Sequence, residues 1–266
     1  MRMQAMIFAA GLGTRLKPIT DTMPKALVRV GDKTLLEHVI LKLKAAGADR
    51  VVINVHHFAE QIIDFVAANN NFGLDILISD ESGKLLETGG GIKKAMSLFH
   101  ADKPILVHNV DILSNVNLKN FYDDNYDNDA TLLVSERNTK RYLLFDDELA
   151  LRGWTNIGTS EVKIRGAVAS QINKDITDKE NVDLKNHVVD SIQSYDKYAF
   201  SGIHLFSPRL FPCFDLYPDK FGIMDFYLGL PTDVNVKGYV KKDLRLMDVG
   251  KLDTLKDAEE FVNCNL

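Results

Sequence analysis

The stretch "AMIFAAGLGTRLKP", residues 5–18, decides the fold, because an apolar run ends at two glycines and continues into cations. Gly11 and Gly13 are followed at once by Thr14 and Arg15. Glycine tolerates positive φ and allows close backbone approach, so these residues suit a tight strand-to-helix turn. Backbone N–H groups next to an arginine are also typical of an anion-binding loop. The stretch therefore predicts a buried strand that ends in a plain turn or a phosphate-binding loop.

Two common phosphate-binding motifs do not match this turn. A P-loop needs a second glycine five positions after the first, followed by lysine and serine or threonine. The dinucleotide fingerprint G-x-G-x-x-G needs its third glycine at the same position. Leu16 stands there in both cases. The turn is therefore neither a P-loop nor a dinucleotide fingerprint.

Composition limits the class of protein. The chain has 266 residues, 45% of them hydrophobic, enough for one large α/β domain or two small ones. A net charge of -5 argues against a general nucleic-acid binder. Cys213 and Cys264 lack C-x-x-C spacing, which indicates neither a disulfide framework nor a zinc site. No apolar run approaches the ~20 residues of a membrane span, and Arg15 and Lys17 disfavour a signal peptide. We expect a cytoplasmic protein with no nucleic-acid or membrane partner.

Strand and helix patterns alternate through the first part of the chain. Short β-branched runs predict strands covered on both faces, and amphipathic segments predict helices between them. The strand-like runs are 51–57, 74–79 and 105–110, and the helical segments are 34–47, 59–68 and 90–99. This alternation predicts an α/β fold, with a Rossmann-like, mixed and mainly parallel sheet flanked by helices.

The pattern changes after Ala130. Successive strand-like runs with short turns predict antiparallel additions to the edge of the sheet in the C-terminal half. These runs are 130–136, 141–146, 149–154, 161–166 and 199–207. Pro208 marks a helix start, and residues 251–266 have helical periodicity. Since no repeat or linker interrupts the chain, we expect a single domain, 1–266.

The opening motif continues as "GLGTRLKPITDTMPKAL", in which Pro24 precedes Lys25, ten positions after Arg15. This resembles the signature of the sugar-1-phosphate nucleotidyltransferases, in which G-x-G-T-R-L is followed by Pro-Lys. The segment "LLETGGGIKKA", residues 85–95, resembles the family loop that holds base, ribose and sugar, in the form of the N-acetylmuramic acid 1-phosphate branch. "AFSGIHLFSPRLF", residues 199–211, resembles the sugar-side strand.

The resemblance implies a glycosyltransferase-A-like nucleotidyltransferase fold. It also implies an enzyme that joins a nucleoside triphosphate to a sugar 1-phosphate and releases pyrophosphate. Residues 1–114 would form the nucleotide-binding half, and residues 115–266 the sugar-phosphate-binding half with a C-terminal helix. Between residues 137 and 195 the chain lacks the Glu-Lys-Pro element that many members place near the sugar phosphate.

Two further segments resemble the metal-binding parts of that family. "VHNVDIL" resembles the strand whose terminal aspartate binds Mg²⁺, with Val110 in place of the usual glycine before Asp111. "LMDVGKLDTL" resembles the segment that supplies a second metal aspartate, here Asp248. Mg²⁺ favours one or two carboxylates together with phosphate oxygens and water. The resemblance thus implies Mg²⁺ as cofactor, although an aspartate at a strand end also commonly caps a turn.

Site roles follow from the resemblance and from charge, because anionic reactants repel unless cations separate them. Arg15 would hold the β- and γ-phosphates, and Lys25 the α-phosphate or the incoming phosphate; these two are the expected catalytic residues. The expected nucleotide-binding residues are Ala10, Gly11, Gly13, Thr14, Arg15, Thr88 and Gly89, and the expected substrate-binding residues are Glu87, Gly90 and Gly202. Structural alternatives remain, in which glycines 89–91 open a helix and Gly202 marks a bulge.

The nucleotide and the sugar stay open. The "LETGGG" form favours UTP and an N-acetylated amino sugar phosphate. Guanylyl transfer to mannose or heptose 1-phosphate, or cytidylyl transfer to phosphocholine, would use the same loop and aspartates. A non-catalytic nucleotide-sugar sensor is the alternative of another class, although such a sensor needs no metal carboxylates. The sequence does not predict the oligomeric state.

Overall fold

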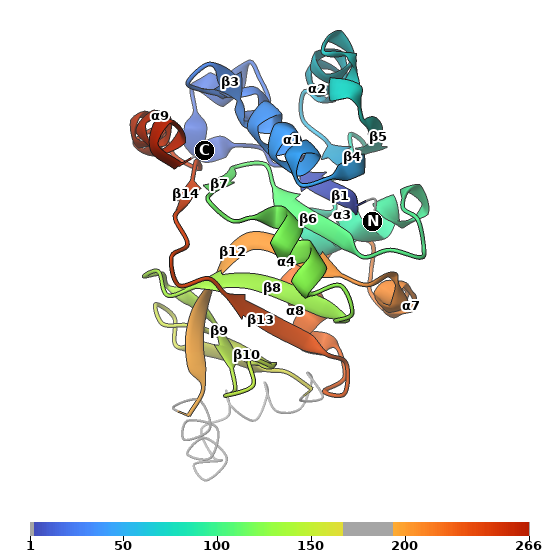
Figure 1. Ribbon diagram of the computed structural model, residues 1–266, viewed down its shortest axis with the longest axis vertical. Helices are drawn as coiled ribbons and strands as arrows, with labels where there is room; N and C mark the ends of the chain where they lie inside the picture. The colour runs from blue at the N-terminus through green and yellow to red at the C-terminus, as the bar shows by residue number, and fades with distance from the viewer. Residues whose placement is uncertain (1–2, 167–193, 266) are drawn as a thin grey trace.

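The computed structural model describes residues 3–166 and 194–265. A ten-stranded mixed sheet runs through them in the order β11-β10-β9-β12-β6-β1-β4-β5, with β8 beside β12 and β13 beside β8. The N-terminal elements lie at one end of the molecule, and β9 and β10 lie at the other (Figure 1). The sheet therefore takes strands from both parts of the chain.

The N-terminal part of the sheet is parallel. β1 (Met3–Phe8) pairs with β4 (Ala48–Val55) and β6 (Ile105–Asn109), and β4 pairs with β5 (Asp75–Asp80). Helices α1 (Leu35–Ala45), α2 (Ala59–Ala68) and α3 (Glu87–Ala95) connect these strands. Because the strands are parallel, their carboxyl ends meet at one edge of the sheet, where ligands bind in such folds.

The C-terminal strands continue the same sheet in antiparallel fashion. β12 (Asp196–Phe206) pairs with β6, with β8 (Ala130–Ser135) and with β9 (Arg141–Phe145). β10 (Leu151–Asn156) lies between β9 and β11 (Glu161–Ile164), and β13 (Val236–Val240) runs parallel to β8. The predicted architecture, a mixed sheet with antiparallel additions in the C-terminal half, is confirmed.

Short elements complete the fold. Two ribbons lie off the main sheet, β2 (Arg29–Val30) with β3 (Lys33–Thr34) and β7 (Ile112–Ser114) with β14 (Leu246–Asp248). The remaining α-helices are α4 (Leu118–Asp124), α7 (Phe211–Phe214), α8 (Ile223–Gly229) and α9 (Thr254–Asn265). The 3₁₀ helices are Thr14–Leu16, Ile19–Asp21, Lys25–Leu27, Asn70–Gly73, Met96–Leu98 and Pro208–Leu210.

Two predicted helices have different bounds in the structure. The segment expected at 90–99 starts earlier, at Glu87, and its α-helical part ends at Ala95. The segment expected at 251–266 starts at Thr254. None of the helices in the described ranges is long and apolar enough to cross a membrane.

The sheet separates two hydrophobic cores. Residues of α1 and α4 pack on one face, and residues of α3 and α8 pack on the other (Figure 1). The two faces of β1 are buried in different cores, since Ile7 belongs to one core and Met6 to the other. Burial on both faces explains why this strand is apolar at nearly every position.

Two histidines are buried in the sheet next to this apolar packing. His204 on β12 places Nδ1 2.7 Å from the Tyr227 hydroxyl, and burial lowers its pKa to about 3. His108 on β6 places Nδ1 2.7 Å from the Asn109 carbonyl, and burial lowers its pKa to about 4. Neither Nε2 atom has a hydrogen-bond partner among the described residues. Both imidazoles are therefore neutral in the folded state at neutral pH.

We predict that His204→Phe weakens the loss of stability on acidification. In the unfolded chain this histidine has a pKa near 6.5 and binds a proton, whereas in the folded protein it stays neutral. The free energy of unfolding therefore falls as the pH drops below about 6.5. Between pH 7 and pH 5, His204 lowers the free energy of unfolding of the wild type by about 2 kcal/mol, and the variant lacks this contribution. Urea unfolding at both pH values measures the difference. Equal pH dependence in the two proteins would contradict the prediction.

Candidate active site

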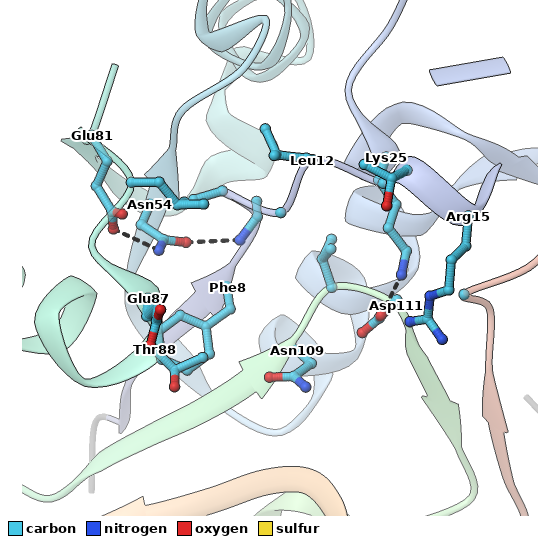
Figure 2. A pocket seen from close by; sticks show the side chains of 18 residues that line it. Phe8, Leu12, Arg15, Lys25, Asn54, Glu81, Glu87, Thr88, Asn109 and Asp111 are labelled. Atoms are coloured by element: carbon cyan, nitrogen blue, oxygen red, sulfur yellow. Dashed lines mark hydrogen bonds and ion pairs between the residues drawn. The ribbon is translucent and has the colours of Figure 1, made fainter. Parts of the chain in front are cut away.

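A cavity of about 570 Å³ opens at the carboxyl ends of the parallel strands. Most of the site residues predicted from the sequence line it, namely Ala10, Gly11, Gly13, Thr14, Arg15, Lys25, Glu87, Thr88 and Asp111. Figure 2 shows Arg15, Lys25 and Asp111 together on one side of it. The fold thus brings the end of β1, the end of β6 and the start of α3 around one space.

The loop after β1 presents free N–H groups to this cavity. Its first amide, Ala9 N–H, donates to Asn54 Oδ1 at 2.8 Å. Within the described part of the chain, no N–H group of residues 10–14 donates a hydrogen bond. Backbone donors without partners at a cavity wall form a suitable site for an anion.

The two glycines of this loop have different surroundings. Gly13 has a φ of 63°, and a Cβ there would lie 2.9 Å from Thr20 Cγ2 and 3.0 Å from Lys25 Cβ. The Thr20 hydroxyl donates to the Gly13 carbonyl at 2.8 Å. By contrast, a Cβ on Gly11 would meet no atom within 4 Å. Gly13 is required by the protein's own packing, whereas the space at Gly11 belongs to the cavity.

An ion pair joins this loop region to the end of β6. The Lys25 ammonium, 10% exposed as a side chain, donates to Asp111 Oδ2 (Figure 2). Lys25 begins a 3₁₀ helix, and Asp111 follows β6 by two residues. The Asp111 carbonyl also accepts from Val249 N–H at 2.9 Å, which attaches the end of β14 to the same point. One aspartate therefore connects three segments that are distant in the sequence.

Asp248 lies close behind this pair, on the β14 ribbon rather than on the main sheet. It does not line the cavity, but Gly250 does, and a Cβ on Gly250 would lie 2.8 Å from Asp248 Oδ1 and 3.1 Å from Arg15 Nη2. Burial, and next the charge of Asp111, raise the pKa of Asp248. The negative charges of the two carboxylates therefore repel each other.

This donor set fits a magnesium ion. Mg²⁺ takes hard oxygen ligands and uses one or two carboxylates in sites that also bind phosphate. The Lys25 ammonium on Asp111 shows that a cation is accommodated at that carboxylate. Within the described residues no group of three or more histidine, cysteine, aspartate or glutamate side chains is placed to hold a metal. A metal here would be bound by the Asp111 and Asp248 pair.

Of the residues expected at the ligand near the start of α3, Thr88 lines the cavity, whereas Gly89 and Gly90 do not. The Thr88 hydroxyl lines the cavity and accepts from Ile223 N–H at 2.9 Å. Gly89 and Gly90 do not line the cavity, because both donate their N–H groups to the Phe221 carbonyl, at 2.9 and 3.2 Å. A Cβ on Gly89 would lie 2.3 Å from the Phe221 ring. These two glycines, expected at the ligand, let the start of α3 pack against the chain.

Gly202 also lies outside the cavity wall. Its φ of 73° coincides with a register shift in the pairing of β12 with β8, so it occupies a bulge. A Cβ on Gly202 would lie 2.9 Å from Asn109 Nδ2, and Asn109 does line the cavity. Gly202 thus occupies the bulge expected as its structural alternative, and its contact with substrate stays a prediction.

Asn54 and Glu81 form a buried polar pair at the cavity wall that the sequence did not predict. Asn54 Nδ2 donates to Glu81 Oε1 at 2.8 Å (Figure 2). Glu81 Oε2 accepts from Leu86 N–H at 3.1 Å. The two residues are 3% and 1% exposed, yet both line the cavity. An amide within the apolar run "VVINVHH" was the available signal for Asn54, whereas no pattern marked Glu81.

Comparisons with known proteins agree with this geometry. N-acetylmuramate alpha-1-phosphate uridylyltransferase of Caulobacter vibrioides is 47% identical over 109 residues, 40% of this chain and 45% of that protein. Mannose-1-phosphate guanyltransferase of Neurospora crassa is 40% identical over 112 residues, 41% of this chain and 30% of that protein. Each match thus spans less than half of the curated relative's length.

A solved structure has a similar fold. HddC from Yersinia pseudotuberculosis, complexed with GMP-PN, has a TM-score of 0.69 at 23% identity and covers 98% of this chain and 99% of its own. The nucleotidyl transferase family model matches residues 4–143, which include the glycine loop, Lys25 and Asp111. Since this match covers more than half of the 266 residues, the chain belongs to the nucleotidyl transferase family.

Proposed function

We propose that this protein transfers a nucleotidyl group from a nucleoside triphosphate to a sugar 1-phosphate and releases pyrophosphate. The observation that carries the proposal is the wall of one cavity, where residues 10–14, whose N–H groups have no partner among the described residues, lie beside Arg15, Lys25 and Asp111. In this reaction an oxygen of the sugar phosphate attacks the α-phosphorus while pyrophosphate leaves. Little covalent chemistry is asked of the protein, so positioning and charge provide the catalysis.

The leaving pyrophosphate needs donors and positive charge. The free amides of residues 10–14 would bind phosphate oxygens, and the Arg15 guanidinium would hold the β- and γ-phosphates through paired hydrogen bonds. Glycine at position 11 would let these oxygens approach the backbone closely. Removal of one such contact in the transition state typically costs about 3 kcal/mol, or about a hundredfold in rate.

Lys25 would neutralise charge at the reacting phosphates. Its ammonium lies on Asp111, at the end of β6, and thus next to the carboxylate pair. Asp111 and Asp248 would hold Mg²⁺, which when bound supplies charge neutralisation at phosphate oxygens. Lys25 and Arg15 also offset the repulsion between the two aspartates, since both lower the pKa of Asp248 against burial and Asp111.

UTP is the favoured donor and an N-acetylated amino sugar 1-phosphate the favoured acceptor. The uridylyltransferase relative and the "LETGGG" segment support this choice. Guanylyl transfer is the second candidate, because a guanyltransferase relative is 40% identical over a similar length of this chain. Glu87 and Thr88 at the cavity wall are available to bind ribose or sugar hydroxyls.

Pyrophosphate release tests the proposal. Each of UTP, GTP, CTP, ATP and dTTP is combined with N-acetylmuramate, N-acetylglucosamine, mannose, heptose and glucose 1-phosphates, and with phosphocholine, in the presence of Mg²⁺. We expect the fastest release with UTP and an N-acetylated amino sugar phosphate. Release with GTP alone would move the assignment to guanylyl transfer, and no release with any pair, together with nucleotide-sugar binding, would support a sensor.

We predict that substitution of Gly11 affects nucleotide binding, whereas substitution of Gly13 affects stability. Gly11→Ala adds a methyl group to open cavity space, so it weakens nucleoside triphosphate binding about tenfold or more and leaves the unfolding free energy unchanged. Gly13→Ala places a side chain at positive φ against Thr20 and Lys25, so it lowers the unfolding free energy by about 1–3 kcal/mol. Calorimetric titration and urea unfolding measure the two quantities. A Gly11→Ala protein that binds nucleotide like the wild type would exclude the loop as the phosphate site.

We predict that Asp111→Asn lowers the turnover number at saturating Mg²⁺ by at least about a hundredfold. The amide keeps an oxygen for the Lys25 ammonium but loses the negative charge, so the fold is retained. The matched control is Asp75→Asn, since Asp75 begins β5 at the opposite edge of the sheet and pairs with Arg50 there. The control keeps wild-type turnover. Near-normal turnover of Asp111→Asn would remove Asp111 from the mechanism.

A further inference from the structure

Thr20 packs against the glycine loop but does not line the cavity. It lies in the 3₁₀ helix Ile19–Asp21, and only 2% of its surface is exposed. Both branches of its side chain lie close to Gly13. The hydroxyl donates to the Gly13 carbonyl at 2.8 Å, and Cγ2 would lie 2.9 Å from a Cβ placed on Gly13. Thr20 thus contacts the peptide group that joins Gly13 to Thr14.

The carbonyl of Gly13 accepts two hydrogen bonds. The second donor is Leu16 N–H, at 2.8 Å, within the same short turn. A carbonyl oxygen has two lone pairs, so the protein itself uses both. Because threonine is branched at Cβ, its χ1 angle is restricted, and the hydroxyl of Thr20 keeps its direction. The peptide group between Gly13 and Thr14 is therefore fixed at its carbonyl end.

The direction of this carbonyl determines the direction of the N–H group that follows it. The peptide between Gly13 and Thr14 is trans. In a trans peptide the C=O and N–H bonds point in opposite directions. The Thr14 N–H therefore points away from the hydroxyl of Thr20. Gly13 and Thr14 both line the cavity, and the Thr14 N–H has no acceptor in the described part of the chain.

The lack of a side chain at Gly13 makes other orientations of this peptide group accessible. Glycine adopts backbone conformations of either φ sign, so the bond from Leu16 alone holds the group weakly. Rotation of the group would turn the Gly13 carbonyl toward the cavity and the Thr14 N–H away from it. A carbonyl oxygen repels a phosphate, whereas an N–H group binds one. The hydroxyl of Thr20 thus stabilises the orientation that suits an anion.

We propose that Thr20 is a positioning residue for phosphate binding. Its hydroxyl holds the peptide group between Gly13 and Thr14 so that the Thr14 N–H faces the cavity and donates to an oxygen of the leaving pyrophosphate. The inference rests on the proposed function and adds a residue that acts through the loop, without touching the substrate. A donor that is oriented in advance needs no reorganisation when the ligand binds. Without the hydroxyl, only part of the protein has the binding orientation, and the apparent affinity falls by that fraction.

Binding of inorganic pyrophosphate with Mg²⁺ tests the inference, because pyrophosphate is the product whichever base and sugar the enzyme uses. Thr20→Val keeps the shape of the side chain and loses the hydroxyl. We expect its dissociation constant in calorimetric titration to rise about tenfold, the value of one hydrogen bond. Thr20→Ser keeps the hydroxyl and loses the methyl group, so it should recover most of the affinity. A role in packing alone would give the reverse order.

The matched control is Thr155→Val. Thr155 is 7% exposed on β10, and its hydroxyl donates to the Glu161 carbonyl at 3.2 Å. This strand lies at the end of the molecule opposite the N-terminal elements (Figure 1). Thr155→Val and Thr20→Val each lose one buried hydroxyl bond, so the urea midpoint should fall by a similar small amount in both. Thr155→Val should bind pyrophosphate like the wild type.

The amide proton of Thr14 gives a direct readout. We expect its NMR resonance in the wild type to move downfield on addition of pyrophosphate, and to move less in Thr20→Val. An unshifted Thr14 resonance in the pyrophosphate complex of the wild type would overturn the inference. Equal affinities of the wild type and Thr20→Val would do the same and leave the proposed function intact. A wild type that binds neither pyrophosphate nor any nucleoside triphosphate would contradict the proposed function, and the inference with it.

Discussion

The ion pair between Lys25 and Asp111 is the interaction on which the site depends. It joins the segment after the glycine loop to the end of β6, and the Asp111 carbonyl holds the end of β14 through Val249 N–H. The end of β14, which carries Asp248 from a distant part of the sequence, is thereby held next to Asp111. A carboxylate that anchors a buried ammonium and repels a second carboxylate is arranged for cations and phosphate rather than for packing.

The glycine loop supplies the complementary element. Its turn is set by Gly13, whose positive φ and close contacts with Thr20 and Lys25 exclude a side chain. In that conformation residues 10–14 line the cavity, and their N–H groups donate no hydrogen bond to the described residues. Asn54 and Glu81 fix the start of the loop and the segment before α3 by buried hydrogen bonds. The loop is thus held open by the protein before any ligand arrives, which lowers the cost of binding.

Sequence patterns predicted most of the fold, because strand and helix periods are local properties. The same holds for the glycine loop, which the sequence placed at the end of β1. The roles of Gly89, Gly90 and Gly202 could not be decided from the sequence, because a glycine that leaves room for a ligand and one that leaves room for another part of the chain look alike there. Asp248 was expected at a strand end, yet that strand belongs to a separate ribbon with β7, a long-range pairing that no local pattern encodes. The Asn54 and Glu81 pair could not be predicted for the same reason, since the two residues are far apart in the chain.

A crystal structure with a non-hydrolysable UTP analogue and Mg²⁺ tests the central claim most directly. The account predicts phosphate oxygens within about 3 Å of backbone nitrogens in residues 10–14, the Arg15 guanidinium on the β- and γ-phosphates, and metal between Asp111 and Asp248. A nucleotide bound with its phosphates away from this loop, and with Arg15 turned from them, would contradict the account.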